Sequence, residues 1–125
     1  MKTPKERDSR FCPLLAFSKA AGGKYKMRIL WELKEGAKRY GELRQSAIVA
    51  AQGKPVAPRV LSRELKELHA LGLIHRKQYP VMPPKVEYSL TPRGKSLLPV
   101  IQKIVTWGLA AARELAAKEA SPAKA

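Results

Sequence analysis

The chain has 125 residues, of which 25 are lysine or arginine and 10 are aspartate or glutamate, so its net charge is +15 at pH 7. This length suits one domain with its own core, and a charge of this size repels itself in a compact monomer unless an anionic partner neutralises it. No apolar run approaches the roughly 18 residues that span a bilayer, the start MKTPKERDSR has no apolar secretion signal, and one cysteine with two histidines argues against a disulfide or a zinc site. We therefore expect a cytoplasmic, nucleoid-associated protein that binds a polyanion and needs no cofactor or metal.

The positive charge is concentrated in two segments. Residues 19–44 carry eight basic and three acidic side chains, and residues 54–95 carry nine and three. Together they hold +11 of the +15. The charge is thus predicted to belong to the folded part of the chain and not to a basic tail.

The N-terminal half of the chain predicts three short helices, over residues 13–21, 25–35 and 40–47. The first can begin at Pro13, because proline is accepted in a first helical turn. Glycine pairs or single glycines follow the first two helices and end them. Apolar side chains in 25–35 recur at helical spacing, so this helix is expected in the core.

Residues 58–71 predict a basic amphipathic helix. Apolar side chains recur there every three or four positions and form one stripe, while polar and basic side chains share the opposite face. The stripe consists of Val60, Leu61, Leu65, Leu68 and Leu71, and the other face carries Arg59, Ser62, Arg63 and Lys66. One face can therefore pack while the other reaches outward.

Two short strands are predicted after this helix, over residues 73–78 and 86–90, because β-formers alternate there. Pro83 and Pro84 mark a loop between them. A recognition helix followed at once by a hairpin at 79–87 is the order of a winged helix-turn-helix. The expected fold is mainly α with a small two-stranded β wing.

A long helix is predicted over residues 92–117, beginning at the capping residue Thr91. If it runs to about residue 115 it measures roughly 35 Å, longer than so small a core requires. Its surplus apolar face suggests a subunit interface. The domain is expected to span 11–117, with flexible ends at 1–10 and 118–125.

Several motifs occur in the order found in one known family. They are CPLL from Cys12, GGKYKMRILWEL from Gly22, RYGEL from Arg39, LSRELKELHALGLI from Leu61, YPVMPPKVEYSLTPRG from Tyr79, and the late Trp107 and Gly108. In these motifs the sequence resembles the HxlR-type family of bacterial transcription regulators, winged helix-turn-helix proteins akin to the MarR group. The resemblance implies a homodimer whose terminal helices pair and whose recognition helices enter successive major grooves of a palindromic operator.

The sequence departs from the family pattern at three places. The connection at Ile48 to Gly53 is longer than usual, so the helix-turn-helix geometry can differ. Ala57 stands where a capping serine or threonine is common, which weakens the helix start. Tyr25 replaces a tryptophan, an exchange that preserves an aromatic core position.

Duplex DNA is the polyanion that this arrangement fits. Four residues are candidates for groove contacts, because arginine can bond guanine bidentately and the others can reach base edges. These are Arg59, Ser62, Arg63 and Lys66. Five others are candidates for backbone contacts from the third helix and the wing, namely Arg39, Arg44, Arg76, Lys77 and Lys85. From the stripe alone, a solvated charged face remains the alternative.

Cys12 has two readings. A free cysteine is most often a small buried hydrophobe. However, Cys12 lies at a predicted helix N-terminus two residues from Arg10, where thiolate is favoured. The resemblance implies that a cysteine in this motif can sense an electrophile or oxidant, which would then act as the inducer.

The remaining aromatic and imidazole side chains are expected to serve structure. Trp31, Trp107, Tyr79 and Tyr88 are interpreted as packing residues and not as a stacking platform, and His69 and His75 as surface residues. No nucleophile with a base, paired carboxylates or phosphate loop is found, so catalysis is not expected. Two rival functions stay open: an architectural DNA binder of little sequence preference, and a winged-helix module that binds an acidic protein.

Overall fold

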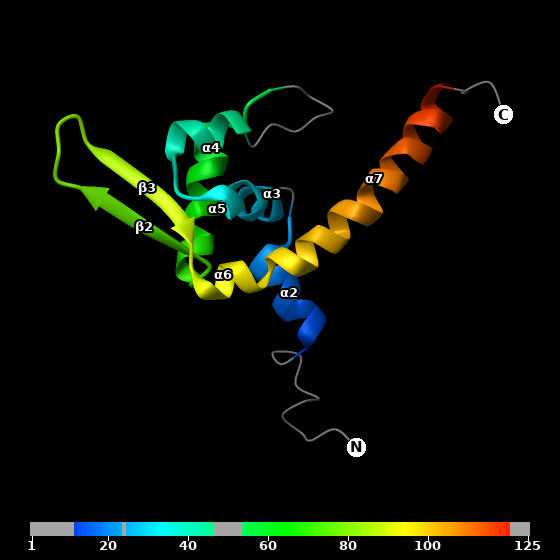
Figure 1. The fold of residues 1–125 in the computed structure, drawn as a ribbon, viewed down its shortest axis with the longest axis horizontal. Helices are drawn as coiled ribbons and strands as arrows, with labels where there is room; N and C mark the ends of the chain where they lie inside the picture. Colours follow the sequence, from blue (N-terminus) through cyan, green and yellow to red (C-terminus); the bar gives the residue numbers. More distant parts are fainter. Residues whose placement is uncertain (1–11, 24, 47–53, 121–125) are drawn as a thin grey trace, which may run out of the picture.

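A computed structural model describes residues 12–23, 25–46 and 54–120. Its helices pack together beside a small antiparallel sheet, whose hairpin projects at one side, and one long helix extends away at the other (Figure 1). Three predictions concern residues outside the described part of the chain: the flexible N-terminus 1–10, the position of Arg10 near Cys12, and the connection at 48–53.

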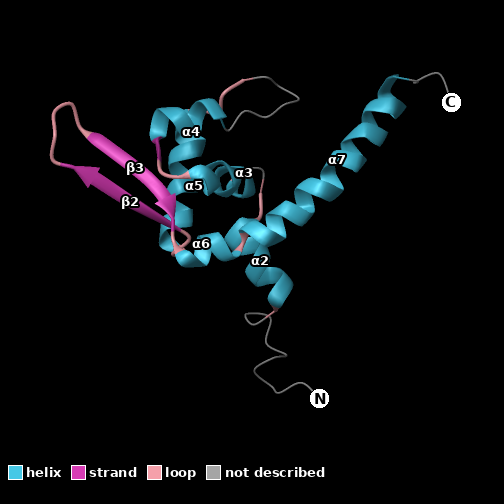
Figure 2. Ribbon diagram, viewed as in Figure 1, coloured by secondary structure: helices cyan, strands magenta, loops and turns pink. Residues whose placement is uncertain are grey.

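The elements follow the predicted order (Figure 2). In sequence they are α2 (Pro13–Ala21), α3 (Lys26–Glu32), the 3-10 turn η2 (Leu33–Glu35), β1 (Lys38–Arg39), α4 (Tyr40–Ser46), α5 (Pro58–Ala70), β2 (Ile74–Tyr79), β3 (Lys85–Leu90), α6 (Pro92–Ser96) and α7 (Leu98–Ala120). The mainly helical winged helix-turn-helix fold is therefore confirmed.

The sheet has three strands in the order β1-β3-β2, all antiparallel. The hairpin of β2 and β3 pairs Ile74 with Leu90 at its base and Tyr79 with Lys85 near its turn. The third strand, β1, adds two residues to the predicted two-stranded wing. Two residues are too few to show an alternating pattern, so the sequence did not indicate this strand.

The core forms where α3, α4, α5, the sheet base and the start of α7 meet. Its fully or nearly buried side chains are Ile29, Leu30, Leu33, Leu43, Val56, Leu61, Leu65, Leu68, Leu73, Ile74, Leu90 and Ile101. The prediction that the second helix lies in the core is confirmed by Ile29 and Leu30, both fully buried.

The end of α5 is fixed by a glycine. Gly72 has φ +74°, a conformation that costs glycine little. The turn lets the amide of Leu73 donate to the carbonyl of Leu68, 3.0 Å away. This geometry leads the chain directly from α5 into β2.

The start of α6 follows the predicted cap. The hydroxyl of Thr91 accepts a hydrogen bond from the amide of Gly94 at 3.0 Å and donates one to the carbonyl of Gly72 at 2.6 Å. Thr91 therefore joins the last helices to the end of α5.

The single long helix predicted over 92–117 is wrong in one respect, because α6 ends at Ser96 and α7 begins at Leu98. Pro99 explains the break. It has no amide hydrogen, and its ring would clash with the carbonyl four residues earlier, but it is tolerated in a first turn. α7 runs to Ala120, so it includes the first residues of the segment 118–125; residues 121–125 lie outside the described part.

α7 extends beyond the body that it packs on (Figure 1). Ile101 is only 2% exposed, whereas Trp107 is 74% and Leu115 60% exposed. The expectation that Trp107 packs within the domain is therefore wrong. In the described residues no helix is both long and apolar enough to cross a membrane.

Candidate nucleic-acid interface

The helix α5 presents the four predicted groove residues to solvent. Arg59, Ser62, Arg63 and Lys66 are all exposed, whereas Leu61, Leu65 and Leu68 are buried. Two members of the predicted apolar stripe differ: Val60 is only half-buried and Leu71 is 36% exposed, since Leu71 already lies past the last helical turn. The amphipathic pattern thus gives the correct outward face.

A buried ion cluster fixes the inner face of α5. Glu64 is buried beside the leucines, and its carboxylate lies 2.6 Å from the Nζ of Lys26 on α3. The same Nζ lies 2.6 Å from the carboxylate of Glu67. This cluster was not predicted from the sequence, although Glu64 and Lys26 stand among apolar positions of their helices, where a charge usually needs a partner.

The charges of this cluster support each other. Burial lowers the pKa of Lys26, but its hydrogen bonds to Glu64 and Glu67 outweigh burial and the pKa ends above 10.5. The hydrogen bond from Lys26 lowers the pKa of Glu67 below 4.5. Lys26 therefore contributes stability below about pH 10.5 that is lost as pH rises through its folded pKa, and Glu67 contributes stability above 4.5 that is lost as pH falls through its lowered pKa.

Replacing Lys26 by methionine is expected to lower the free energy of unfolding by about 1–3 kcal/mol, because the buried carboxylate of Glu64 would lose its buried cation and keep only the exposed guanidinium of Arg63, whose Nη2 lies 3.3 Å away. Urea unfolding at neutral pH measures this. Lys66→Met is the matched control, since it removes the same charge from an exposed position of α5, and it should change stability by about 0.5 kcal/mol or less. Adding Glu64→Gln to Lys26→Met should recover part of the loss; equal stabilities of the Lys26 and Lys66 variants would contradict the role given to the cluster.

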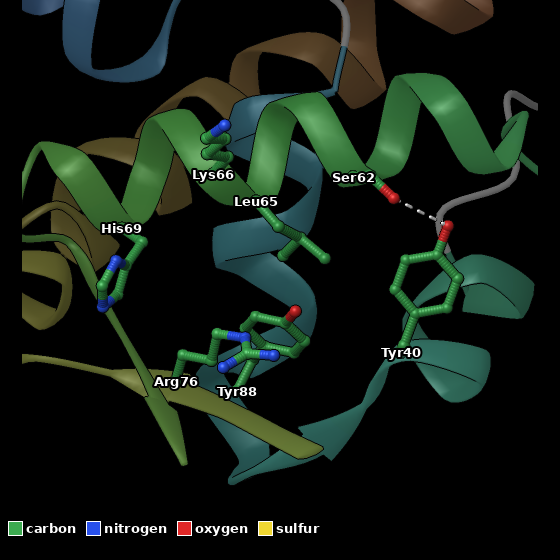
Figure 3. A pocket seen from close by; sticks show the side chains of 7 residues that line it. All are labelled: Tyr40, Ser62, Leu65, Lys66, His69, Arg76 and Tyr88. Atoms are coloured by element: carbon green, nitrogen blue, oxygen red, sulfur yellow. Dashed lines mark hydrogen bonds between the residues drawn. The ribbon is translucent and has the colours of Figure 1, made fainter. Parts of the chain in front are cut away.

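A cleft of about 290 Å³ separates α5 from the sheet (Figure 3). Its lining is aromatic, hydroxylic and cationic, and it contains no carboxylate. The lining residues are Tyr40, Ser62, Leu65, Lys66, His69, Arg76 and Tyr88. Within the part of the chain that the structure describes, neither Lys66 nor Arg76 has an ion-pair or hydrogen-bond partner. The cleft is therefore positively charged and uncompensated.

The cationic residues of the wing lie on two opposite faces of the sheet. Arg76 pairs across the strands with Tyr88, so both side chains share the face toward α5. Lys77 and Arg39 both pair with Glu87, which places them on the other face. Of the predicted wing contacts Arg76, Lys77 and Lys85, it is therefore Arg76 that lies beside the surface of α5 and lines the cleft.

The outer face of the wing is organised around Tyr79. Two ammonium groups contact its ring, with the Nζ of Lys77 at 4.8 Å and that of Lys85 at 4.6 Å from the centroid. Its hydroxyl donates to Glu87 at 2.7 Å. This bond raises the pKa of Tyr79 and lowers that of Glu87. Lys85 is thus partly neutralised by Glu87, 3.6 Å from its Nζ, whereas Lys77 contacts the ring and keeps its charge.

The predicted contact residues of the third helix have internal roles as well. The Nε of Arg44 donates to the carbonyl of Val56 at 3.0 Å, so Arg44 anchors the chain that leads into α5. The backbone amide of Arg39 donates to Glu42 at 2.9 Å, and the side chain of Arg39 is exposed. Ala57 precedes α5 without a side-chain capping bond, as its sequence position predicts.

Cys12 stands immediately before α2 and is half-exposed. Its carbonyl accepts the hydrogen bond from the amide of Ala16 at 2.9 Å, while its side chain makes no capping bond. The thiol is thus at a helix N-terminus, as predicted. His69 and His75 are both exposed, as expected, although His69 lines the cleft.

A helix with an outward basic face, followed directly by a β hairpin, is the arrangement of a winged helix-turn-helix protein. The family description "HxlR-like helix-turn-helix" matches residues 20–115. The chain belongs to this family.

Relatives and solved structures agree with this assignment. The chain is 48% identical over 90 residues to the HTH-type transcriptional regulator YdzF of Bacillus subtilis, which covers 71% of this chain and 77% of YdzF. It is similar to the redox regulator HypR in its oxidized form, with a TM-score of 0.70 and 35% identity over 79% of this chain and 96% of HypR. A regulator of the MarR family from Porphyromonas gingivalis gives a TM-score of 0.69 and 36% identity over 87% and 95% of the two chains. The relatives are transcriptional regulators, in agreement with the interpretation of the sequence.

Proposed function

We propose that this regulator is a homodimer that binds a specific, palindromic duplex operator. The observation that supports this most is the exposed basic face of α5 beside a cleft whose cations Lys66 and Arg76 lack partners in the described residues. Phosphates compensate such cations and release counterions when they do so. Membership of a helix-turn-helix family also supports DNA binding.

The proposed contacts divide by position. Arg59, Ser62, Arg63 and Lys66 face the major groove from α5. Arg76 joins them from the inner face of the sheet, whereas Arg39, Lys77 and Lys85 meet DNA only where the outer face of the wing reaches it. Arg44 contributes to the backbone contact through its terminal nitrogens, since its Nε holds Val56.

The apolar side of α7 supports a dimer. Val100, Ile104, Trp107 and Leu115 recur at helical spacing and are 38–74% exposed. Leu14 on α2 is 78% exposed. A monomer rarely exposes so continuous an apolar stripe, and a second copy of this helix covers it by symmetry.

The deciding experiment is selection of genomic DNA fragments by the purified protein at about 150 mM salt. We expect an inverted repeat with half-sites about 34 Å apart, one helical turn, and resistance of the complex to unrelated DNA by a factor of roughly 10³. Bound fragments that share no motif would instead identify an architectural DNA binder. No duplex binding at all would favour the module that binds an acidic protein.

A response to oxidants through Cys12 is a second candidate function. It is supported by the half-exposed thiol before α2 and by the similarity to a structure described as a redox regulator. If the selection is repeated after treatment with diamide, which takes up two electrons and two protons as the Cys12 thiols of two subunits form a disulfide, recovery of the motif should fall. The Cys12→Ser variant should recover the motif equally well with and without diamide. If the wild type also recovers the motif equally well after diamide, the redox function is ruled out and the DNA-binding function stands.

A further inference from the structure

Tyr40 is the first residue of α4, and its hydroxyl contacts the start of α5. The oxygen lies 2.8 Å from the carbonyl oxygen of Pro58. It also lies 3.2 Å from the Oγ of Ser62 (Figure 3). Ser62 is one of the exposed residues on the outward face of α5. A hydroxyl that is proposed to meet DNA is therefore already bonded to a second hydroxyl within the protein.

The direction of the two hydrogen bonds follows from counting protons. A tyrosine hydroxyl has one hydrogen, and a carbonyl oxygen can only accept. The hydrogen of Tyr40 must therefore point to Pro58, in the shorter of the two bonds. In the contact between the hydroxyls, Ser62 is then the donor and Tyr40 the acceptor.

This direction determines what Ser62 can offer to DNA. A serine hydroxyl has one hydrogen and two lone pairs, and the hydrogen is already used. In the major groove the amino groups of adenine and cytosine donate, whereas guanine O6 and thymine O4 accept at the corresponding positions. Only the bases with an amino group can bond to a serine that presents lone pairs.

We propose that Tyr40 sets the base preference of Ser62, so that each half-site has one position where adenine or cytosine is selected over guanine or thymine on the contacted strand. This inference rests on the proposed function. Tyr40 is a positioning residue here, because it acts through Ser62 and does not itself touch the base. Without Tyr40, the serine hydroxyl would rotate and donate to keto oxygens as readily as it accepts.

The test is selection from a library of randomised half-sites, with the wild type compared with three variants. The wild type should prefer amino over keto bases at one position by roughly 2- to 10-fold, the effect of one hydrogen bond. Ser62→Ala and Tyr40→Phe should each reduce that preference below about twofold, and Ser62→Thr, which keeps the hydroxyl, should retain it. The other positions of the motif should keep their preferences in all variants.

This readout separates base selection from a purely structural role. If Tyr40 only joined α4 to α5, Tyr40→Phe would weaken binding to all sequences equally and leave the preference at this position unchanged, which would overturn the proposal. A position whose preference survives Ser62→Ala would overturn it too. A wild type that enriches no motif would instead overturn the proposed function, and this inference with it.

The hydrogen bond can also be tested without DNA. In urea unfolding, the double variant Tyr40→Phe with Ser62→Ala should differ from the sum of the single variants by about twofold or more in the unfolding constant, because the two side chains are in contact. Additive effects would show that the two hydroxyls do not interact and would overturn the proposal whatever the DNA preference.

Discussion

Reversing the charges of Arg59, Arg63 and Lys66 to glutamate should lower operator affinity by about a thousandfold or more. Each lost contact to a base or phosphate costs about 1–3 kcal/mol, and every 1.4 kcal/mol is tenfold in affinity. All three side chains are exposed on α5, but Arg63 also contacts the buried Glu64 at 3.3 Å, so circular dichroism must first show that the triple variant is folded. Fluorescence anisotropy with a labelled operator at fixed salt measures the loss.

The matched control reverses three exposed cations that lie outside α5 and the sheet, namely Lys34, Arg93 and Lys95. It changes the net charge by the same amount, so it should affect DNA only through long-range attraction, which salt screens beyond about 10 Å. A loss of no more than about tenfold is expected. If both triple variants lost affinity equally, binding would depend on net charge alone, as in the architectural reading, and the face assigned to α5 would be wrong.

The helices that were predicted best from the sequence are those in which apolar residues recur at helical spacing over several turns. In α5, one stripe of leucines at three- and four-residue spacing gives both the helix and its outward face. The break at Leu97 was missed for the opposite reason: the same apolar period continues across it, and only the missing amide of Pro99 interrupts the helix.

The candidate site could be predicted as a set of residues but not as a geometry. The two-residue period of a strand already implies that Arg76 and Lys77 point to opposite faces, and the register of the hairpin decides which of them faces α5. The bond from Arg44 to Val56 and the pairing of Lys26 with Glu64 join residues far apart in the sequence. No local pattern predicts such contacts.

Introducing aspartate at Ile104 and Trp107 should convert the proposed dimer to monomers and lower operator affinity by roughly 10²- to 10⁴-fold, the advantage that linked binding gives. Burial of a tryptophan removes about 150–250 Å² from water, which at about 25 cal/mol per Å² is worth roughly 4–6 kcal/mol. Trp107 is 74% exposed in the single chain, so most of this stabilisation is available only to a partner. Sedimentation equilibrium gives the mass, and anisotropy gives the affinity for one and for two half-sites.

Substitutions on the other faces of α7 provide the controls for this experiment. Gln102→Asp, on an exposed polar position of the same helix, introduces one aspartate away from the apolar stripe and should leave a dimer, in contrast to either Ile104→Asp or Trp107→Asp alone. Ile101→Asp, at a side chain only 2% exposed, should unfold the chain, because it buries a carboxylate in the domain's own core. The variants at Ile104 and Trp107 should instead remain folded, with unchanged helical circular dichroism and undiminished affinity for a single half-site. A folded monomer that still binds the full operator as tightly as the wild type would mean that one subunit is sufficient, and α7 would then need a different partner for its exposed face.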